Sequence, residues 1–196
     1  MSFISQLNLH KRQSVIKNSV IRTRRLESTD ITWISTCGGR FIVLSDSLLS
    51  DWHGCPDDAD PLDTSHDYGR ACATSGYSST LRVGAGNALI FGENKLGGVW
   101  LRRSLPILFE WVYANDENAV IAAMDNLPND PTVDDTTDFT VDSDSLVVFD
   151  SVSTGLDFEP RHSCRFSVPV GRYIIGSTYF KPDDETGLIL HRFLPA

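Results

Sequence analysis

The sequence is poor in the features that mark secreted, membrane and metal-bound proteins. It has four cysteines in 196 residues and no CxxC pair, so neither a disulfide scaffold nor a zinc ribbon is indicated. No apolar run approaches the ~20 residues that cross a bilayer, and the first residues lack the apolar core of a signal peptide. These absences predict a cytoplasmic protein whose thiols are reduced and mostly buried.

Basic residues are also missing from one long stretch of the chain. Between residues 104 and 160 there is no lysine or arginine, whereas the same stretch holds thirteen acidic residues. Residues 1–30 hold six basic and two acidic residues, and the whole chain has a net charge of −9. Such a charge repels nucleic acid and anionic membranes but attracts a basic protein and accelerates its association. From charge alone, a basic protein partner and acidic loops that only keep the protein in solution explain the pattern equally well.

The length and the 41% hydrophobic content indicate one domain with one core. Residues 1–30 form a basic N-terminal extension, and residues 31–196 form the domain, with the acidic segment 104–160 inside it. From Ile31 onward, short apolar runs separated by glycine or aspartate clusters predict antiparallel strands of one sheet system. The double glycines Gly38–Gly39 and Gly97–Gly98 predict tight turns.

Helical patterns are few. Residues 116–127 place apolar side chains on one face behind an acidic first turn, which predicts a helix. Weaker patterns indicate short helices at residues 46–52 and 63–73, and residues 128–145, rich in Asp, Thr and Pro, are expected to form an exposed loop. The expected fold class is α+β, mainly antiparallel β-sheet with few short helices.

No catalytic constellation emerges from the spacing of reactive residues. Ser65, His66 and Asp67 are consecutive, so their side chains diverge and cannot form a nucleophile–base chain by adjacency. The run GAGNAL that starts at Gly84 lacks the third glycine of a dinucleotide loop and lies between two strand-like runs, which favours a β-turn. His191 beside Arg192 is more typical of a hydrogen-bonded strand histidine than of an acid–base pair.

Metal and ligand sites are weakly indicated. His53, Cys55, Asp57, Asp58 and His66 are candidate ligands that match no known metal-binding spacing. The tryptophans could line a ligand pocket, but core anchors are the more frequent role of such residues in sheets; they are Trp52, Trp100 and Trp111. We therefore expect no metal and no cofactor.

The ordered segments WISTCGGRFIVLSDSLLSDWHG, HDYGRACA, VGAGNALIFGE, ILFEWVYA and VGRYIIGSTYFKPDDETGLILHRFLP resemble the immunity protein 21 family of bacterial polymorphic toxin systems. The resemblance runs from about Trp33 to Pro195. It implies an α+β domain, encoded beside toxin genes, that neutralises the neighbouring toxin, often a nuclease. The positions that carry the resemblance, expected to define the fold more than a binding surface, are Gly38, Gly39, Trp52, Gly54, Asp67, Tyr68, Arg70, Cys72, Gly84, Gly86, Trp111, Gly171, Tyr173, His191 and Arg192.

Charge and resemblance together predict a non-enzymatic, stoichiometric inhibitor of a cognate, basic toxin, with no nucleic-acid or membrane partner. The aspartates expected to bind the toxin are Asp130, Asp134, Asp135, Asp138, Asp142 and Asp144. One alternative is a small-molecule-binding or enzymatic domain with a pocket lined by Trp52, Tyr68, Arg70 and Trp111. Another is a structural component of a phage or secretion apparatus. The sequence leaves the oligomeric state open.

Overall fold

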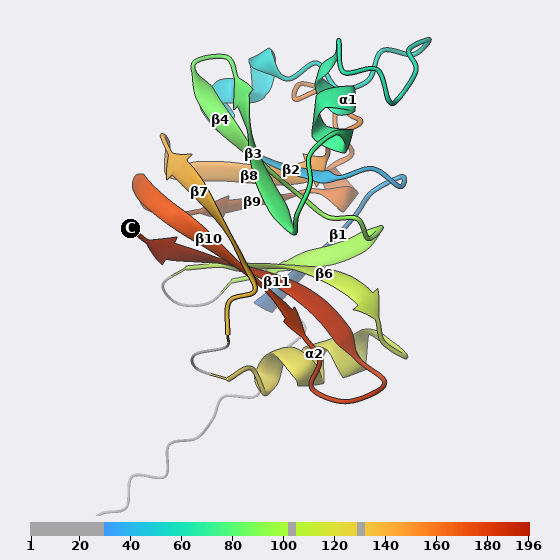
Figure 1. Cartoon of the computed structure of the whole chain (residues 1–196), viewed down its shortest axis with the longest axis vertical. Helices are drawn as coiled ribbons and strands as arrows, with labels where there is room; N and C mark the ends of the chain where they lie inside the picture. Colours follow the sequence, from blue (N-terminus) through green and yellow to red (C-terminus); the bar gives the residue numbers. More distant parts are fainter. Residues whose placement is uncertain (1–29, 102–104, 129–131) are drawn as a thin grey trace, which may run out of the picture.

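The structure is a computed structural model that describes residues 30–101, 105–128 and 132–196. The basic extension, apart from Asp30, lies outside the described residues, so the division of the chain into extension and domain stays a prediction. Two antiparallel sheets form the body of the protein (Figure 1). The six-stranded sheet has the order β1 (Ile31–Ser35), β5 (Leu96–Trp100), β6 (Ile107–Tyr113), β11 (Gly187–Pro195), β10 (Gly171–Phe180) and β7 (Asp135–Val141). The five-stranded sheet has the order β3 (Ser78–Val83), β4 (Gly86–Phe91), β2 (Phe41–Ser45), β8 (Ser145–Asp150) and β9 (Cys164–Ser167).

Mostly antiparallel strands and few short helices agree with the expected fold class, but the expectation of one sheet system was wrong. Strand β2 shows why two sheets form. All five of its residues are buried. Phe41 and Val43 face the core between the sheets, whereas Ile42 and Leu44 belong to a second core on the other face. A strand buried on both faces needs a layer on each side.

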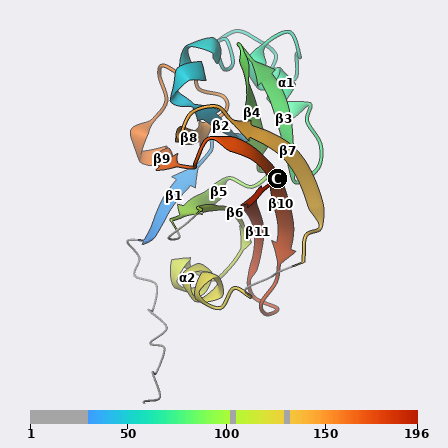
Figure 2. The ribbon, with the colours of Figure 1, turned by 90° about the vertical axis from the view of Figure 1, so that its left-hand side faces the viewer.

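The described chain therefore forms four layers. One core lies between the sheets, and each sheet packs its outer face against helices. Helix α2 (Glu117–Asp125) covers part of the six-stranded sheet, and the 3₁₀ helix η2 (Asp46–Asp51) lies with α1 (Asp67–Cys72) at the five-stranded sheet. Figures 1 and 2 show these helices at opposite ends of the molecule. A further 3₁₀ turn, η3, spans Pro160–His162.

The helix expected at residues 116–127 is confirmed as α2. Asp116 is its N-cap, and the Asp116 Oδ1 accepts a hydrogen bond from the Ala119 backbone N at 2.9 Å. This bond satisfies one of the free N–H groups of the first turn. Val120 and Met124 are fully buried on the sheet, as the apolar spacing predicted. The weaker helix predictions are confirmed in shorter form as η2 and α1.

The two double glycines have different roles. Gly38 lies in the β1–β2 connection with φ +118°, in the left-handed region that favours glycine. The turn expected at Gly97–Gly98 was wrong, because both residues lie inside β5 and pair with β6. A Cβ on Gly98 would lie 2.5 Å from the ring of Phe109. Glycine is needed there for close packing and not for a turn.

The loop expected at residues 128–145 is also corrected. Residues 135–141 form β7, an edge strand paired along its length with β10. Phe139 and Val141 point into the core between the sheets, whereas the polar side chain of Asp138 is exposed. The sequence did not indicate this strand, because only the last two of its inward positions, Phe139 and Val141, are apolar.

Candidate functional site

The six aspartates expected to bind the toxin separate into groups with different surroundings. Asp130 lies outside the described residues. Asp134 Oδ2 accepts a hydrogen bond from the Tyr179 backbone N at 2.7 Å, and Asp135 Oδ2 accepts one from the Tyr77 backbone N at 3.1 Å. These two carboxylates hold β7 against its neighbours. In contrast, Asp138, Asp142 and Asp144 are exposed.

The acidic third of the sequence does not form one acidic face. Glu110 and Asp150 are buried, and each accepts hydrogen bonds inside the fold. Asp116 and Glu117 lie at the start of α2. The β7–β8 turn, with Asp142, lies instead beside β4, because a Cβ on Gly86 would lie 2.6 Å from an Asp142 carboxylate oxygen. Folding thus distributes these acids over separate parts of the surface.

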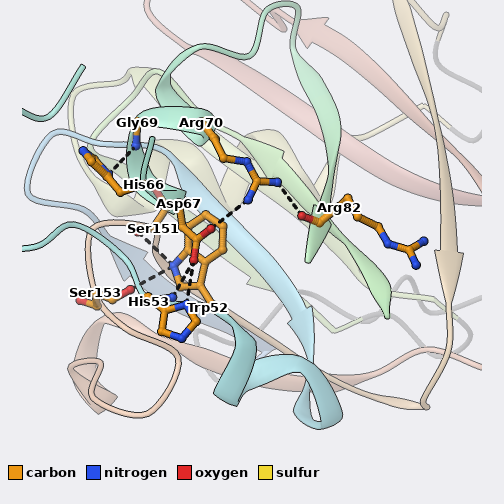
Figure 3. A network of polar contacts seen from close by, with 9 residues as sticks. All are labelled: Trp52, His53, His66, Asp67, Gly69, Arg70, Arg82, Ser151 and Ser153. Atoms are coloured by element: carbon orange, nitrogen blue, oxygen red, sulfur yellow. Dashed lines mark hydrogen bonds and ion pairs between the residues drawn. The ribbon is translucent and has the colours of Figure 1, made fainter. Parts of the chain in front are cut away.

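The family-like residues of the five-stranded half join α1 to the sheet (Figure 3). Trp52 is 1% exposed, and its Nε1 donates hydrogen bonds to the carbonyl oxygens of Ser151 and Ser153, both at 3.1 Å. Its ring packs in the core under α1. A buried indole with a satisfied N–H anchors a core and has no free polar atom for a ligand.

Asp67 and Arg70 continue this network along α1. Asp67 Oδ2 accepts a hydrogen bond from the His53 backbone N at 2.8 Å, and Asp67 Oδ1 accepts one from Arg70 Nη1 at 2.9 Å. Arg70 Nη2 donates to the Arg82 carbonyl at 2.6 Å, which ties α1 to β3 (Figure 3). His66 caps α1, since its Nδ1 accepts from the Gly69 N at 3.1 Å. Of the consecutive residues Ser65, His66 and Asp67, the last two therefore have structural roles.

Glycines of the same half permit close backbone contacts. Gly54 has φ +64°, and a Cβ there would lie 2.6 Å from the Ser153 carbonyl oxygen. A Cβ on Gly39 would lie 2.7 Å from the hydroxyl of Tyr68, a residue far from it in sequence. Burial is the main cause that raises the pKa of Tyr68, followed by its hydrogen bond with Cys72.

Three further family-like positions lie in the six-stranded half, whereas Gly84 and Gly86 lie at the β3–β4 turn of the five-stranded sheet. Tyr173 is buried and donates its hydroxyl to the Pro169 carbonyl at 2.8 Å. Trp111 is half-buried, with its ring centroid 5.8 Å from that of Trp33. Arg192 is half-buried on β11, opposite Gly176 of β10.

The expected alternative pocket of Trp52, Tyr68, Arg70 and Trp111 is not assembled. Trp52 belongs to the core between the five-stranded sheet and α1, whereas Trp111 packs against the cluster that contains α2. The helices that belong to these clusters, α1 and α2, lie at opposite ends of the molecule (Figure 1). Four residues divided between two layers cannot line one cavity.

A buried polar network, not expected from the sequence, lies at one end of the core between the sheets. His191 of β11 is fully buried, and its Nε2 lies 3.1 Å from Glu110 Oε1 on β6. The other oxygen, Glu110 Oε2, accepts hydrogen bonds from the Glu93 backbone N at 3.0 Å and from Asn94 Nδ2 at 2.8 Å. The interpretation of His191 as a hydrogen-bonded strand residue is confirmed.

The charge of Glu110 follows from these contacts. Burial alone raises the pKa of Glu110, but the hydrogen bonds from His191, Asn94 and the Glu93 backbone outweigh burial and hold the pKa below its ordinary value. Glu110 is therefore ionised at neutral pH. A buried carboxylate is stable only when partners such as these satisfy it.

Ser177, His191 and Glu110 have the connectivity of a hydrolase triad. Ser177 Oγ lies 2.9 Å from His191 Nδ1. Ser177 is fully buried, however, and its Oγ also lies 3.2 Å from Ser78 Oγ of the other sheet. A nucleophile must contact its substrate, which a fully buried serine cannot do in this conformation. The arrangement instead joins the two sheets.

A cavity of about 710 Å³ opens beside this network. Its walls carry the carboxylates of Glu93, Glu110 and Asp135. Val112 of β6 and Ile189 of β11 line it as well. The cavity lies where the apolar core between the sheets ends, and its size is in the range of ligand pockets.

The cysteines are all free, as expected, but only Cys164 is buried and Cys37 is exposed. The expectation of mostly buried thiols was therefore wrong. Burial raises the pKa of Cys164 and keeps this thiol protonated.

In the described part of the chain, His, Cys, Asp and Glu side chains form no group of three suited to a metal ion, including around His53. Within the same ranges, none of the helices combines the length and apolar character that a membrane crossing requires.

Sequence reasoning missed the buried network and the cavity. One signal was available, since Glu110 interrupts an apolar strand at the position between Leu108 and Val112. An acid at an inward position of a buried strand needs a partner. The partner could not be identified, because the pairing of β6 with β11 brings together residues 81 positions apart.

Comparison with known proteins agrees with the resemblance of the sequence segments. No curated protein and no solved structure matches this chain. The sequence profile of one family, described as Immunity protein 21, matches residues 32–186, which include the five-stranded sheet and the network of Figure 3 but not β11 of the six-stranded sheet. Because this match covers most of the sequence, the chain belongs to the Immunity protein 21 family.

Proposed function

We propose that this protein neutralises a cognate polymorphic toxin, a basic nuclease domain, by binding it in a one-to-one complex. The family name implies an immunity protein with a protein toxin as its partner. The observation that carries the binding mechanism is the set of exposed aspartates along and beyond β7: Asp138, Asp142 and Asp144. We call these three residues the β7 aspartates.

The β7 aspartates are available for a partner because the fold does not use their carboxylates. Among the described residues, none donates a hydrogen bond or forms an ion pair to them, in contrast to Asp134 and Asp135. A nuclease holds phosphates with Lys and Arg side chains. Exposed carboxylates can occupy those side chains, block substrate access and accelerate encounter at low ionic strength.

Inhibition by occupancy requires no catalytic group in the immunity protein. The one triad-like arrangement found among the described residues is closed to substrate, since Ser177 is fully buried. The free cysteines suit a reducing compartment. We therefore propose a stoichiometric inhibitor that acts in the cytoplasm, with no cofactor and no nucleic-acid partner of its own.

Co-expression with the toxin domain encoded beside this gene tests the proposal. The wild-type chain should restore growth and co-purify with the toxin. Reversal of the β7 aspartates to lysine should weaken the complex by at least tenfold at physiological salt, because three attractive contacts become repulsive.

The control reverses three acids at the β10–β11 turn and changes the net charge equally; they are Asp183, Asp184 and Glu185, all exposed. This control should protect almost as well as wild type. Equal protection by both variants contradicts the role of the β7 aspartates, and the absence of protection by the wild-type chain contradicts the proposed function.

A further inference from the structure

We infer that the cavity between the sheets is a binding site for a cationic side chain, an arginine that the toxin inserts. The inference rests on the proposed function for the identity of the partner, but the site itself follows from the cavity and its lining. None of the sequence patterns indicated it.

The charge of the cavity lining selects a cation. Glu110 contributes an ionised carboxylate that is almost fully buried, and Asp135 and Glu93 contribute two more at the walls. No lysine or arginine is among the described lining residues. A buried charge such as that of Glu110 acts more strongly than the same charge at an open surface. A phosphate or carboxylate ligand is therefore repelled.

The contacts that the protein's own side chains make leave part of this charge uncompensated. Arg40 Nη2 binds Glu93 Oε1 at 2.9 Å, and His191 contacts Glu110. Asp135 has no ion-pair partner in the described ranges, and its carboxylate accepts only backbone N–H groups there, those of Tyr77 and Thr136. Carboxylate oxygens have further lone pairs, so Asp135 and Glu93 can accept a fork of N–H donors, while the buried Glu110 adds its negative charge.

The cavity suits arginine because its lining combines aliphatic, aromatic and polar side chains. Val112 and Ile189 offer aliphatic contact for the stem of a long side chain. Tyr77 offers an aromatic ring, on which a guanidinium stacks. Asn94 lies beside Glu110 and adds an amide to the polar wall. A volume of about 710 Å³ accommodates a whole arginine side chain.

The first test fills the cavity. Val112→Phe places a ring in the space and should weaken the toxin complex by at least tenfold, because an inserted arginine is the kind of anchor that dominates interface energy. Ile189→Phe fills the cavity from the neighbouring strand and should weaken the toxin complex to a similar extent. Val170→Phe is the matched control, since Val170 is 64% exposed outside the cavity and should bind as wild type. Thermal unfolding confirms that each variant is folded.

The second test needs no toxin. The peptides acetyl-Gly-Arg-Gly-amide and acetyl-Gly-citrulline-Gly-amide differ in charge and hardly in shape, and each is titrated into the full-length chain while amide NMR shifts are recorded. We expect saturable shifts at Tyr77, Glu93 and Asn94 with the arginine peptide, and at least tenfold weaker binding of the citrulline peptide. Val112→Phe should abolish the shifts, and Val170→Phe should retain them.

The outcomes separate the two proposals. If wild type binds the toxin and both cavity-filling variants bind it equally well, the toxin does not use the cavity and the inference is overturned while the proposed function stands. If the two peptides bind alike, or shift residues elsewhere, the cavity does not select a cation and the inference is overturned as well. If the arginine peptide binds but no toxin complex forms, the cation site is supported and the proposed function fails.

Discussion

Nε2 of His191 lies 3.1 Å from Oε1 of Glu110, and neither side chain is more than 1% exposed. The two residues come from adjacent strands, β11 and β6, at the point where the apolar core gives way to the cavity. Removal of one partner leaves the other buried polar group without this contact, whereas removal of both eliminates the pair.

The first prediction concerns this pair. Glu110→Leu and His191→Leu should each lower the free energy of unfolding by about 3–5 kcal/mol. The double variant should lose clearly less unfolding free energy than the sum of the two single losses. The reason is that its second substitution removes a group that is already without its partner. Urea unfolding of the four proteins measures the coupling. Additive losses would show that the contact carries no specific energy.

The second prediction is a pH dependence. Because its partners hold the pKa of Glu110 below the ordinary value, this carboxylate stabilises the fold fully above the unfolded-state pKa of about 4.3. That contribution is lost as the pH falls through the lower folded-state pKa. The difference in unfolding free energy between wild type and Glu110→Gln should therefore narrow as the pH falls below about 5.

The exposed Glu159 provides the control for this measurement. Glu159→Gln should differ little from wild type throughout the same range. A Glu110→Gln difference that stays constant as the solution becomes acid contradicts the depressed pKa.

The third prediction distinguishes glycines that the fold requires from one that it does not. Gly54→Ala should lower the free energy of unfolding by at least about 2 kcal/mol, because Gly54 has φ +64° and its Cβ would clash with the Ser153 carbonyl. Gly171→Ala should change it by less than about 1 kcal/mol, since the nearest atom to its Cβ is 3.7 Å away, on Tyr173. Thermal or urea unfolding ranks the variants, and similar losses at both sites contradict this account of Gly54.

The fourth prediction concerns the fork of Arg70. Its two Nη atoms bind Asp67 and the Arg82 carbonyl at the same time. A lysine has one ammonium group in place of the planar fork, so Arg70→Lys should cost about 1–2 kcal/mol of stability. Arg172→Lys is the control, because Arg172 is exposed on β10. An Arg70→Lys protein as stable as the control would show that one of the two bonds is dispensable.

Much of the fold could be predicted because local signals were strong. Apolar alternation indicated most strands, and α2 was evident from the acidic first turn and the spacing of Val120 and Met124. The division into two sheets was not predictable, since a continuous apolar run such as β2 has the same sequence pattern whether the strands form one sheet or two. Strand β7 was missed because Asp135 and Thr137 point inward to polar partners on or beside β3 rather than to apolar ones.

The candidate site was harder to predict than the fold. Composition identified an acidic segment, but only the tertiary structure separates the β7 aspartates from Asp134 and Asp135, whose carboxylates accept backbone hydrogen bonds. The cavity combines residues of β6, β7 and β11 with two loops. Such a site depends on strand register, which sequence periodicity does not specify across long separations.

Titration of the toxin's activity with this protein tests the central claim most directly. Purified toxin domain, at a concentration far above the dissociation constant, is mixed with increasing amounts of the full-length chain, and the residual activity is measured at once and after prolonged incubation. We predict a linear fall that ends at one equivalent and does not change with time. Loss of activity that continues with time at a small fraction of one equivalent would contradict stoichiometric inhibition and indicate catalytic inactivation of the toxin.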